Sequence, residues 1–320
     1  MNNNTKQIIS NKIEDYIRKH NATQKIISTK TGVRQEYVSS ILKGIFTYNA
    51  GKDKVGNIPD EHFYNLADLV DVHIQKQYWV NRPTPQLTQM LAILLEAREN
   101  AYTRLIIGAT GSGKSHAISL YAKEHPTDVF VVKVGSEDTL NILLDKVANT
   151  LNVPIRKHKS LKIRDISLTL KSLYNYGHKP QLIFDEAEYL KVSALCSIKE
   201  FYDYLDKYCS IVMIGTEQLP FQIDKLRKKD ARGIPQLYRR IKFGIRHLPA
   251  IDKTFRLFLK EIKDKDVIKF LTHECDNYGE LHDVLVPCLR EADRLKINLS
   301  LPLIKQVLNL ESRPDLIAMY

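Results

Sequence analysis

The sequence predicts an α/β domain built on a parallel sheet, with an all-α domain before it and a small group of helices after it. Between residues 87 and 214, short apolar runs typical of strands alternate with helix-like segments. That order is typical of a parallel sheet covered by helices on both faces. Before residue 80 and after residue 249 the apolar spacing is helical, so strands are expected only in the middle of the chain.

The first 80 residues predict a compact helical domain. Residues 5–20 carry an apolar stripe at helical spacing, and Thr23 offers a cap for a second helix. A third helix is expected after Gly32 and a fourth from Pro59 to Ile74. The prolines of the segment 82–85 restrict the backbone, which predicts a linker and a domain boundary there.

Four strands are expected in the middle of the chain, and helices fill the intervals between them. Together with the boundary above, they predict three domains, at residues 1–80, 81–249 and 250–320, the last being a helical lid. The expected strands are Arg104–Ile107, Val129–Val134, Gln181–Phe184 and Ile211–Ile214.

Composition limits the classes of function. The 320 residues carry a formal net charge of +11, which favours a polyanionic partner such as nucleic acid. Four isolated cysteines predict neither a disulfide framework nor a zinc site. The sequence has no apolar leader and no long apolar run, so we expect a cytoplasmic protein without a membrane partner.

Residues 108–115 read GATGSGKS and lie between an expected strand and an expected helix. A glycine-rich loop in this position can turn its amides toward phosphate, and the helix dipole favours the same charge. Lys114 would contact the β- and γ-phosphates, and the Ser115 hydroxyl would bind magnesium. A turn without a ligand is the alternative. The predicted ATP-binding residues are Gly108, Ala109, Thr110, Gly111, Ser112, Gly113, Lys114, Ser115 and His116.

Two further strand ends supply polar groups to the same site. Asp185 and Glu186 follow the apolar run 182–184, so both carboxylates are expected where ligands bind in open α/β folds. Asp185 would hold Mg²⁺ and Glu186 would act as the general base on the attacking water. Thr216 follows the next strand and is expected to sense the γ-phosphate or the water, unless it only closes a turn.

At these residues the chain resembles an AAA+ ATPase. The resemblance implies an arginine finger at Arg239 or Arg240, within Gln236–Ile241, that completes the site of a neighbouring subunit. Within the superfamily, the short core, the stretch DEAEYL from Asp185 and the small helical domain resemble the target-selecting transposition ATPases. That family includes the B protein of phage Mu and its relatives TnsC and IstB, and the resemblance covers most of residues 85–300.

One position departs from the AAA+ pattern. Lids of this superfamily commonly carry Gly-x-x-Arg, whereas this chain has Gly279-Glu280-Leu281-His282. His282 is therefore either a weak substitute for the sensor arginine or a surface or packing residue.

The segment Gln24–Gly44 predicts a helix-turn-helix, because a turn glycine, Gly32, separates two helical runs. The second helix would present side chains suited to base edges and phosphates, unless the bundle serves only protein contacts. The predicted DNA-binding residues of this helix are Arg34, Gln35, Ser39 and Lys43.

Two basic runs predict a phosphate-contacting surface on the ATPase core. Residues 156–179 hold seven Lys or Arg and one acid, and residues 225–246 hold nine and one. Such runs are also common as solvated faces, but two in one core favour sequence-independent binding of double-stranded DNA. The predicted contacts are Lys157, Lys159, Lys162, Arg227, Lys228 and Lys229.

The resemblance to the transposition ATPases implies an ATPase of a mobile element, active in DNA transposition and recombination. It would form a homo-oligomer on target DNA, as a helical filament or ring, and deliver that DNA to a transposase; hydrolysis of ATP would favour release. Two alternatives stay open: a helicase loader or replication initiator, and a nucleotide-gated transcription regulator.

Overall fold

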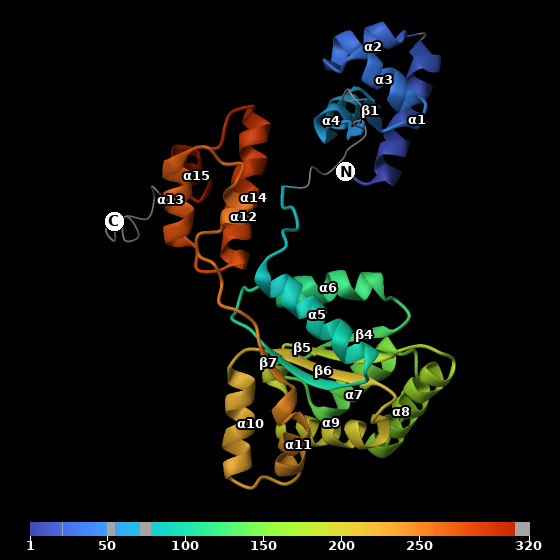
Figure 1. Cartoon of the computed structure of the whole chain (residues 1–320), viewed down its shortest axis with the longest axis vertical. Coiled ribbons are helices and arrows are strands. Elements are labelled where there is room, and N and C mark those ends of the chain that lie inside the picture. Colours follow the sequence, from blue (N-terminus) through green and yellow to red (C-terminus); the bar gives the residue numbers. More distant parts are fainter. Residues whose placement is uncertain (21, 50–54, 71–77, 311–320) are drawn as a thin grey trace. The chain divides into compact units, whose positions relative to one another are not determined.

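The computed structural model describes residues 1–20, 22–49, 55–70 and 78–310, and the chain divides into two compact units. The first unit is Met1–Val80 and the second is Asn81–Tyr320. Figure 1 shows the elements of each unit along the chain.

The N-terminal unit is mainly helical. Thr23 caps its second helix by accepting a hydrogen bond from the amide of Ile26, and Gly32 ends that helix in the left-handed region at φ 70°. Ile13, Ile27 and Phe63 are fully buried in its core. The helices are α1 (Asn3–His20), α2 (Gln24–Thr31), α3 (Gln35–Leu42) and α4 (Asp60–Leu69).

A short antiparallel hairpin, β1 (Thr47–Asn49) and β2 (Val55–Asn57), joins α3 to α4 and was not expected. Each strand has only three residues, which is too short for a strand pattern to show in the sequence. The helix expected at Pro59–Ile74 is present as α4 to Leu69, and residues 71–74 lie outside the described residues.

The second unit has a five-stranded parallel sheet in the order β4-β5-β6-β3-β7. The α/β fold predicted from the sequence is confirmed, and the four expected strands are present. Strand β7 was missed because its three residues, Ile-Arg-His, lie at the sheet edge and carry little apolar signal. The strands are β3 (Thr103–Ile107), β4 (Val129–Lys133), β5 (Gln181–Asp185), β6 (Ser210–Gly215) and β7 (Ile245–His247).

Helices cover both faces of this sheet (Figure 1). Successive strand residues point to opposite faces, so Ile183 packs under α5 and α6 while Leu182 and Phe184 pack under the helices of the other face. The helices around the sheet are α5 (Pro85–Glu99), α6 (Lys114–Glu124), α7 (Leu140–Thr150), α8 (Lys159–Asn175), α9 (Val192–Leu205), α10 (Gln218–Lys228) and α11 (Ile234–Ile241).

The segment after β7 is helical, as expected. It contributes buried side chains such as Val267, Leu271 and Leu281. Its helices are α12 (Arg256–Leu259), α13 (Lys265–Glu274), α14 (Tyr278–Leu295) and α15 (Leu301–Val307).

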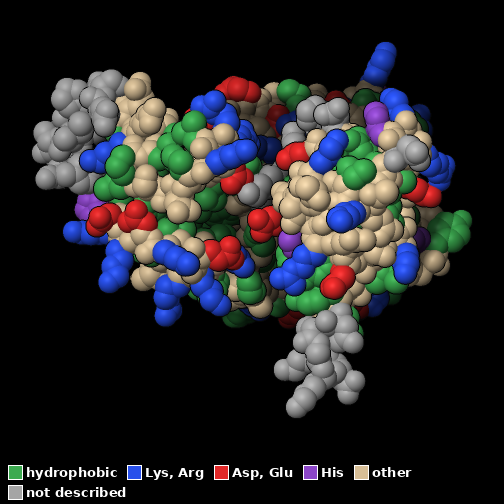
Figure 2. Space-filling view, turned by 90° about the horizontal axis from the view of Figure 1, so that it is seen from above, with side chains coloured by type: hydrophobic (Ala, Val, Ile, Leu, Met, Phe, Trp, Pro, Cys, Tyr) green, Lys and Arg blue, Asp and Glu red, His purple; other side chains and the backbone are tan. Residues whose placement is uncertain are grey.

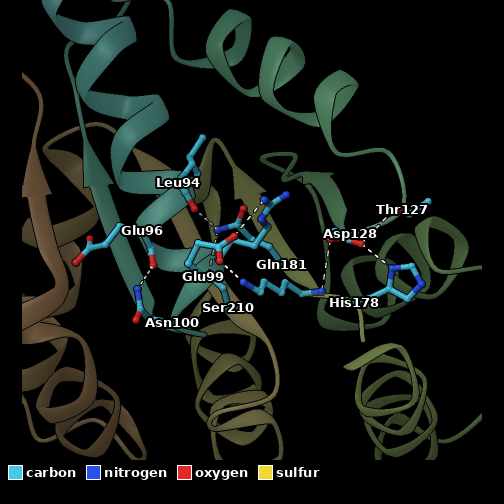
Figure 3. A network of polar contacts seen from close by, with 11 residues as sticks. Leu94, Glu96, Glu99, Asn100, Thr127, Asp128, His178, Gln181 and Ser210 are labelled. Atoms are coloured by element: carbon cyan, nitrogen blue, oxygen red, sulfur yellow. Dashed lines mark hydrogen bonds and ion pairs between the residues drawn. The ribbon is translucent and has the colours of Figure 1, made fainter. Parts of the chain in front are cut away.

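A polar network ties α5 to the amino ends of the central strands (Figure 3). The side-chain amide of Gln181 donates to the carbonyl of Leu94 at 3.0 Å and to Ser210 Oγ at 3.1 Å. Beside it, His178 Nδ1 lies 2.9 Å from Asp128 Oδ1, which joins the turns before β4 and β5. Buried amide bonds of this kind fix the register of α5 on the sheet because breaking them would leave polar groups without partners.

The Asp128 carboxylate predicts a local acid sensitivity. Burial acts to raise its pKa, but hydrogen bonds from His178, Thr127 and a backbone amide outweigh this, and the pKa is lowered. A lowered carboxyl pKa contributes stability above its ordinary value near 4, and that stability is lost as pH falls through the folded value. We expect Asp128→Asn to lose about 1 kcal/mol of unfolding free energy at pH 5 and much less at pH 3. Denaturant unfolding at both pH values measures the difference, and an equal loss at both would contradict the assignment.

Candidate active site

The candidate site lies at the carboxyl edge of the parallel sheet, where several strand ends meet. Strand β3 leads into the loop 108–113, β5 ends in Asp185 and β6 leads into Thr216. Because β3, β6 and β5 are adjacent and parallel, these three groups emerge side by side. Lys133 ends β4, the next strand out.

The loop after β3 has the backbone geometry of an anion cradle. Gly111 and Gly113 have φ values of 70° and 86°, which side-chain-bearing residues rarely adopt. The amides of Ala109, Thr110 and these two glycines donate no hydrogen bond within the described chain. Space beside Gly113 is open to 4 Å, and α6 begins at the next residue. Free amides at a helix N-terminus favour bound phosphate.

The Lys114 side chain folds back over this loop. Its ammonium donates to the carbonyls of Gly108 at 2.9 Å and Ala109 at 2.8 Å. Burial lowers the pKa of Lys114, and the attraction of nearby carboxylates, led by Glu188, offsets part of the effect. The cation is therefore held at the loop mouth by weak carbonyl partners that a phosphate oxygen can replace.

Ser115 and Asp185 join the loop to the neighbouring strand. The Ser115 hydroxyl donates to Asp185 Oδ2 at 2.8 Å, and Asp185 Oδ1 accepts from the amide of Glu186 at 3.0 Å. Asp185 is only 6% exposed. A hydroxyl beside a buried carboxylate supplies the hard oxygen ligands that Mg²⁺ prefers, with phosphate and water oxygens completing the set.

Glu186 projects from the same strand end but is held by a lysine. Its backbone is left-handed at φ 56°, and its carboxylate lies 3.0 Å from the Lys133 ammonium. This hydrogen bond raises the pKa of Lys133. Sequence reasoning missed Lys133, because nothing in a strand-ending lysine shows which neighbour it faces.

Three buried oxygens at this edge have no hydrogen-bond partner among the described residues: Ser112 Oγ, Glu188 Oε2 and Thr216 Oγ1. A buried polar atom without a partner costs about 1–3 kcal/mol, so such atoms mark a place where a ligand completes the bonding. Ser112 lies in the loop, and Glu188 lies against Gly215 beside Thr216. The arrangement fits a nucleotide phosphate chain with Mg²⁺.

His116, also predicted to bind nucleotide, lies on the first turn of α6. Its Nε2 is 2.7 Å from Asn81 Oδ1, so it contacts the segment that leads into α5. The lid residue His282 is half-exposed and lies 3.0 Å from the carboxylate of Asp283. The first turn of its helix, α14, does reach the loop, where the Gly279 amide donates to the Gly111 carbonyl.

The two arginines predicted as a finger differ in environment. Arg240 is held within its own subunit, because its guanidinium pairs with Asp203 and lies 5.1 Å from the Tyr202 ring centroid. Arg239 is exposed and has no partner in the described part of the chain. Only Arg239 is free to reach another molecule without breaking an existing ion pair.

The residues predicted to contact DNA also separate by environment. Lys157, Lys159 and Lys229 are exposed and lack ion-pair partners among the described residues. Arg227 and Lys228 are exposed but both pair with Asp224. Lys162 is only 5% exposed, and its ammonium lies on Asp145, so we remove it from the proposed contacts.

In the N-terminal unit, Gln35 of α3 and its flanking residues Arg34 and Lys43 are exposed, whereas Ser39 is partly buried. In the face shown in Figure 2, many Lys and Arg side chains project outward with acidic side chains between them. Net charge alone therefore does not mark a single binding surface.

Comparisons with known proteins agree with this geometry. A family described as "AAA domain" matches residues 97–223, which span the loop, α6, β5 and β6. The DNA transposition protein B of the Mu-like prophage FluMu from Haemophilus influenzae is 24% identical over 214 residues, covering 65% of this chain and 69% of that protein. The chain is therefore similar to a Mu-like transposition protein B, and its residues 97–223 match an AAA domain. The resemblance stated from the sequence is confirmed at that level.

Solved structures extend the likeness to the fold of this chain. Cdc6p from Pyrobaculum aerophilum superposes with a TM-score of 0.55 at 13% identity, covering 73% of this chain and 69% of that chain. The Aeropyrum pernix ORC2 protein, in its ADPNP-ADP complexes, gives 0.53 at 13% identity, with coverages of 74% and 70%. At this identity the likeness concerns the fold alone.

Across the described residues, no three His, Cys, Asp or Glu side chains lie together as a metal-binding group. Nor does any described helix combine the length and apolar composition needed to cross a bilayer.

The site predicts that binding and turnover can be separated. Lys114→Ala removes the cation at the loop mouth and should weaken nucleotide affinity at least tenfold, whereas Glu186→Gln should keep affinity within about threefold and remove turnover. Isothermal titration with a non-hydrolysable ATP analogue, together with a phosphate-release assay, measures both. Equal nucleotide affinity for the wild type and Lys114→Ala would show that the loop is not the site.

Proposed function

We propose that this protein binds and hydrolyses ATP, assembles on double-stranded DNA and presents that DNA to a transposase. The observation that carries the proposal is the hydrogen bond from Ser115 to Asp185, which unites the loop and the acidic strand end in one site. The similarity of the chain to a DNA transposition protein supports the proposed role in transposition. The fold class alone would fit many other activities.

The chemistry assigned to the protein's own residues is positioning and proton transfer. The loop amides and Lys114 would hold the phosphates, and Ser115 with Asp185 would hold Mg²⁺, which neutralises phosphate charge when bound. Glu186 Oε1 would accept a proton from the attacking water. Thr216 Oγ1, which is buried and has no hydrogen-bond partner among the described residues, would orient that water or the γ-phosphate.

Lys133 keeps the proposed base occupied in this structure. An ammonium 3.0 Å from Glu186 Oε1 competes with water for the lone pairs of this carboxylate. Lys133 is 71% exposed, so solvent screens the pair and its contribution is small. Movement of Lys133 alone would therefore release Glu186 at little cost.

Assembly supplies the positive charge that the site lacks. Lys114 faces carboxylates at the strand ends, and His282 is engaged with Asp283. Arg239 of a neighbouring subunit would complete the γ-phosphate environment, and fingers of this kind accelerate turnover about a thousandfold or more. The exposure of Arg239 and the engagement of Arg240 favour Arg239 in this role.

DNA binding would rest on phosphate contacts. Lys157, Lys159 and Lys229 are exposed cations that form no ion pair within the described part of the chain, so each can pair with phosphate and release a counterion. Exposed side chains of α3 in the N-terminal unit would add contacts in a groove. Contacts made mainly to phosphate give binding with little sequence preference.

The DNA contacts can be tested through salt dependence. A variant with Lys157, Lys159 and Lys229 replaced by alanine should lower the slope of log K against log salt by up to about three, since each lost contact removes about 0.9. Fluorescence anisotropy with duplex DNA and an ATP analogue measures this slope. A control variant with Lys260, Lys263 and Lys269 replaced by alanine has the same net charge and should keep the wild-type slope. An equal decrease of the slope in the two variants would indicate that DNA binding depends on overall charge and not on contacts at these three positions.

The shared site can be tested by mixing inactive proteins. Arg239→Ala keeps the cradle and Lys114→Ala keeps the finger, so their mixture should regain ATPase activity well above the sum of the separate proteins. Arg240→Ala should instead lower thermal stability and keep most of the turnover, because Arg240 pairs within its own subunit. A mixture no more active than its components, beside an active monomeric wild type, would rule out the trans finger.

A further inference from the structure

The first turn of α14 lies directly on the tip of the loop that follows β3. The Gly279 amide donates to the Gly111 carbonyl at 3.3 Å. A Cβ on Gly111 would lie 2.0 Å from Asn277 Oδ1, and one on Gly279 would lie 3.7 Å from Gly111 Cα. The approach is therefore possible only because Gly111 lacks a side chain, and it brings backbone against backbone.

A second contact beside it involves a buried glutamine. Gln86, which is 1% exposed at the start of α5, accepts a hydrogen bond from the Tyr278 hydroxyl at 3.0 Å. Its amide nitrogen donates to the carbonyls of Pro249 at 3.2 Å and Ala250 at 2.6 Å. One side chain thus joins α5, α14 and the segment that connects the sheet to the C-terminal helices.

Packing aims the Tyr278 hydroxyl at this glutamine. The ring lies 5.9 Å from that of Phe255 and 5.4 Å from that of Phe258 between centroids. Asn277 and Glu280 exchange hydrogen bonds of 2.7 and 3.0 Å, which fixes the first turn of α14. The turn that meets Gly111 is therefore closed by its own hydrogen bonds, and Tyr278 joins it to Gln86.

We propose that Gln86 and Tyr278 are positioning residues that hold the start of α14 on Gly111, so that phosphate bound by the loop also orders the C-terminal helices. The proposal rests on the nucleotide site proposed above. It assigns the link between nucleotide and lid to a buried amide and a backbone hydrogen bond, where AAA+ relatives commonly have a lid arginine. When the loop amides bind phosphate, the Gly111 carbonyl is fixed in place. The Gly279 amide, which donates a hydrogen bond to this carbonyl, is then fixed as well.

Amide hydrogen exchange, with and without a non-hydrolysable ATP analogue, tests this link. In the wild type, nucleotide should slow exchange both in the loop, residues 108–116, and at the start of α14, residues 277–282. In Tyr278→Phe, which loses only the hydroxyl, the loop should keep its protection while exchange at 277–282 with nucleotide rises about three- to tenfold. Gln86→Met, of similar volume, should behave in the same way.

Tyr121→Phe is the matched control. Tyr121 lies on α6 and is 2% exposed, and its hydroxyl has no partner among the described residues, so the same deletion breaks no contact there. Tyr121→Phe should keep the nucleotide-induced protection of both segments, residues 108–116 and 277–282. Full nucleotide-induced protection of 277–282 in Tyr278→Phe and Gln86→Met, or an equal loss in Tyr121→Phe, would overturn the proposal. Failure of the analogue to protect residues 108–116 in the wild type would instead refute the nucleotide site, and this proposal with it.

Discussion

The parallel pairing of β3, β6 and β5 is the constraint on which the rest of the structure depends. It aligns Ile107 with Gly215 and Phe184 with Met213, so the three strands end at the same level. The glycine loop, Asp185 and Thr216 then emerge within reach of one another, although they are far apart in the sequence. Strands buried on both faces make this alignment rigid, because a slip by one residue would turn Ile183 and its neighbours toward the wrong layer.

Charge at this edge is arranged in opposed pairs. Lys114 bonds to loop carbonyls near three carboxylates, and Lys133 bonds to Glu186. Two ammonium groups thus face three carboxylates, and a phosphate chain with its metal would redistribute this charge. Exposed, screened pairs exchange partners at low cost, whereas the Ser115 hydroxyl joins the loop to the buried Asp185 carboxylate.

The sequence predicts well what is encoded locally. The loop residues 108–115 specify their own geometry through Gly111 and Gly113, and apolar runs reveal β5 and β6 because both are fully buried. Three-residue elements such as β7 carry too few side chains to show a pattern. The loop and carboxylate roles are supported by their geometry and stay predictions until they are measured.

Contacts between distant segments could not be predicted. Lys159 and Lys162 belong to the same basic run and look alike in the sequence. In the structure, Lys162 is buried and pairs with Asp145, whereas Lys159, one helical turn away, is exposed. Likewise, neither Gln86 nor Tyr278 has a motif, since their meeting depends on how the C-terminal helices fold back. Lys133 lies beside Glu186 only because β4 pairs with β5.

Electron microscopy of the wild-type protein with duplex DNA tests the central claim most directly, namely that nucleotide controls assembly on DNA. With a non-hydrolysable ATP analogue, we expect ordered rings or filaments along the duplex, with the subunits in contact through the nucleotide site and Arg239. Without nucleotide, ordered assemblies should be absent. Isolated monomers on DNA at a saturating concentration of the analogue would contradict the account.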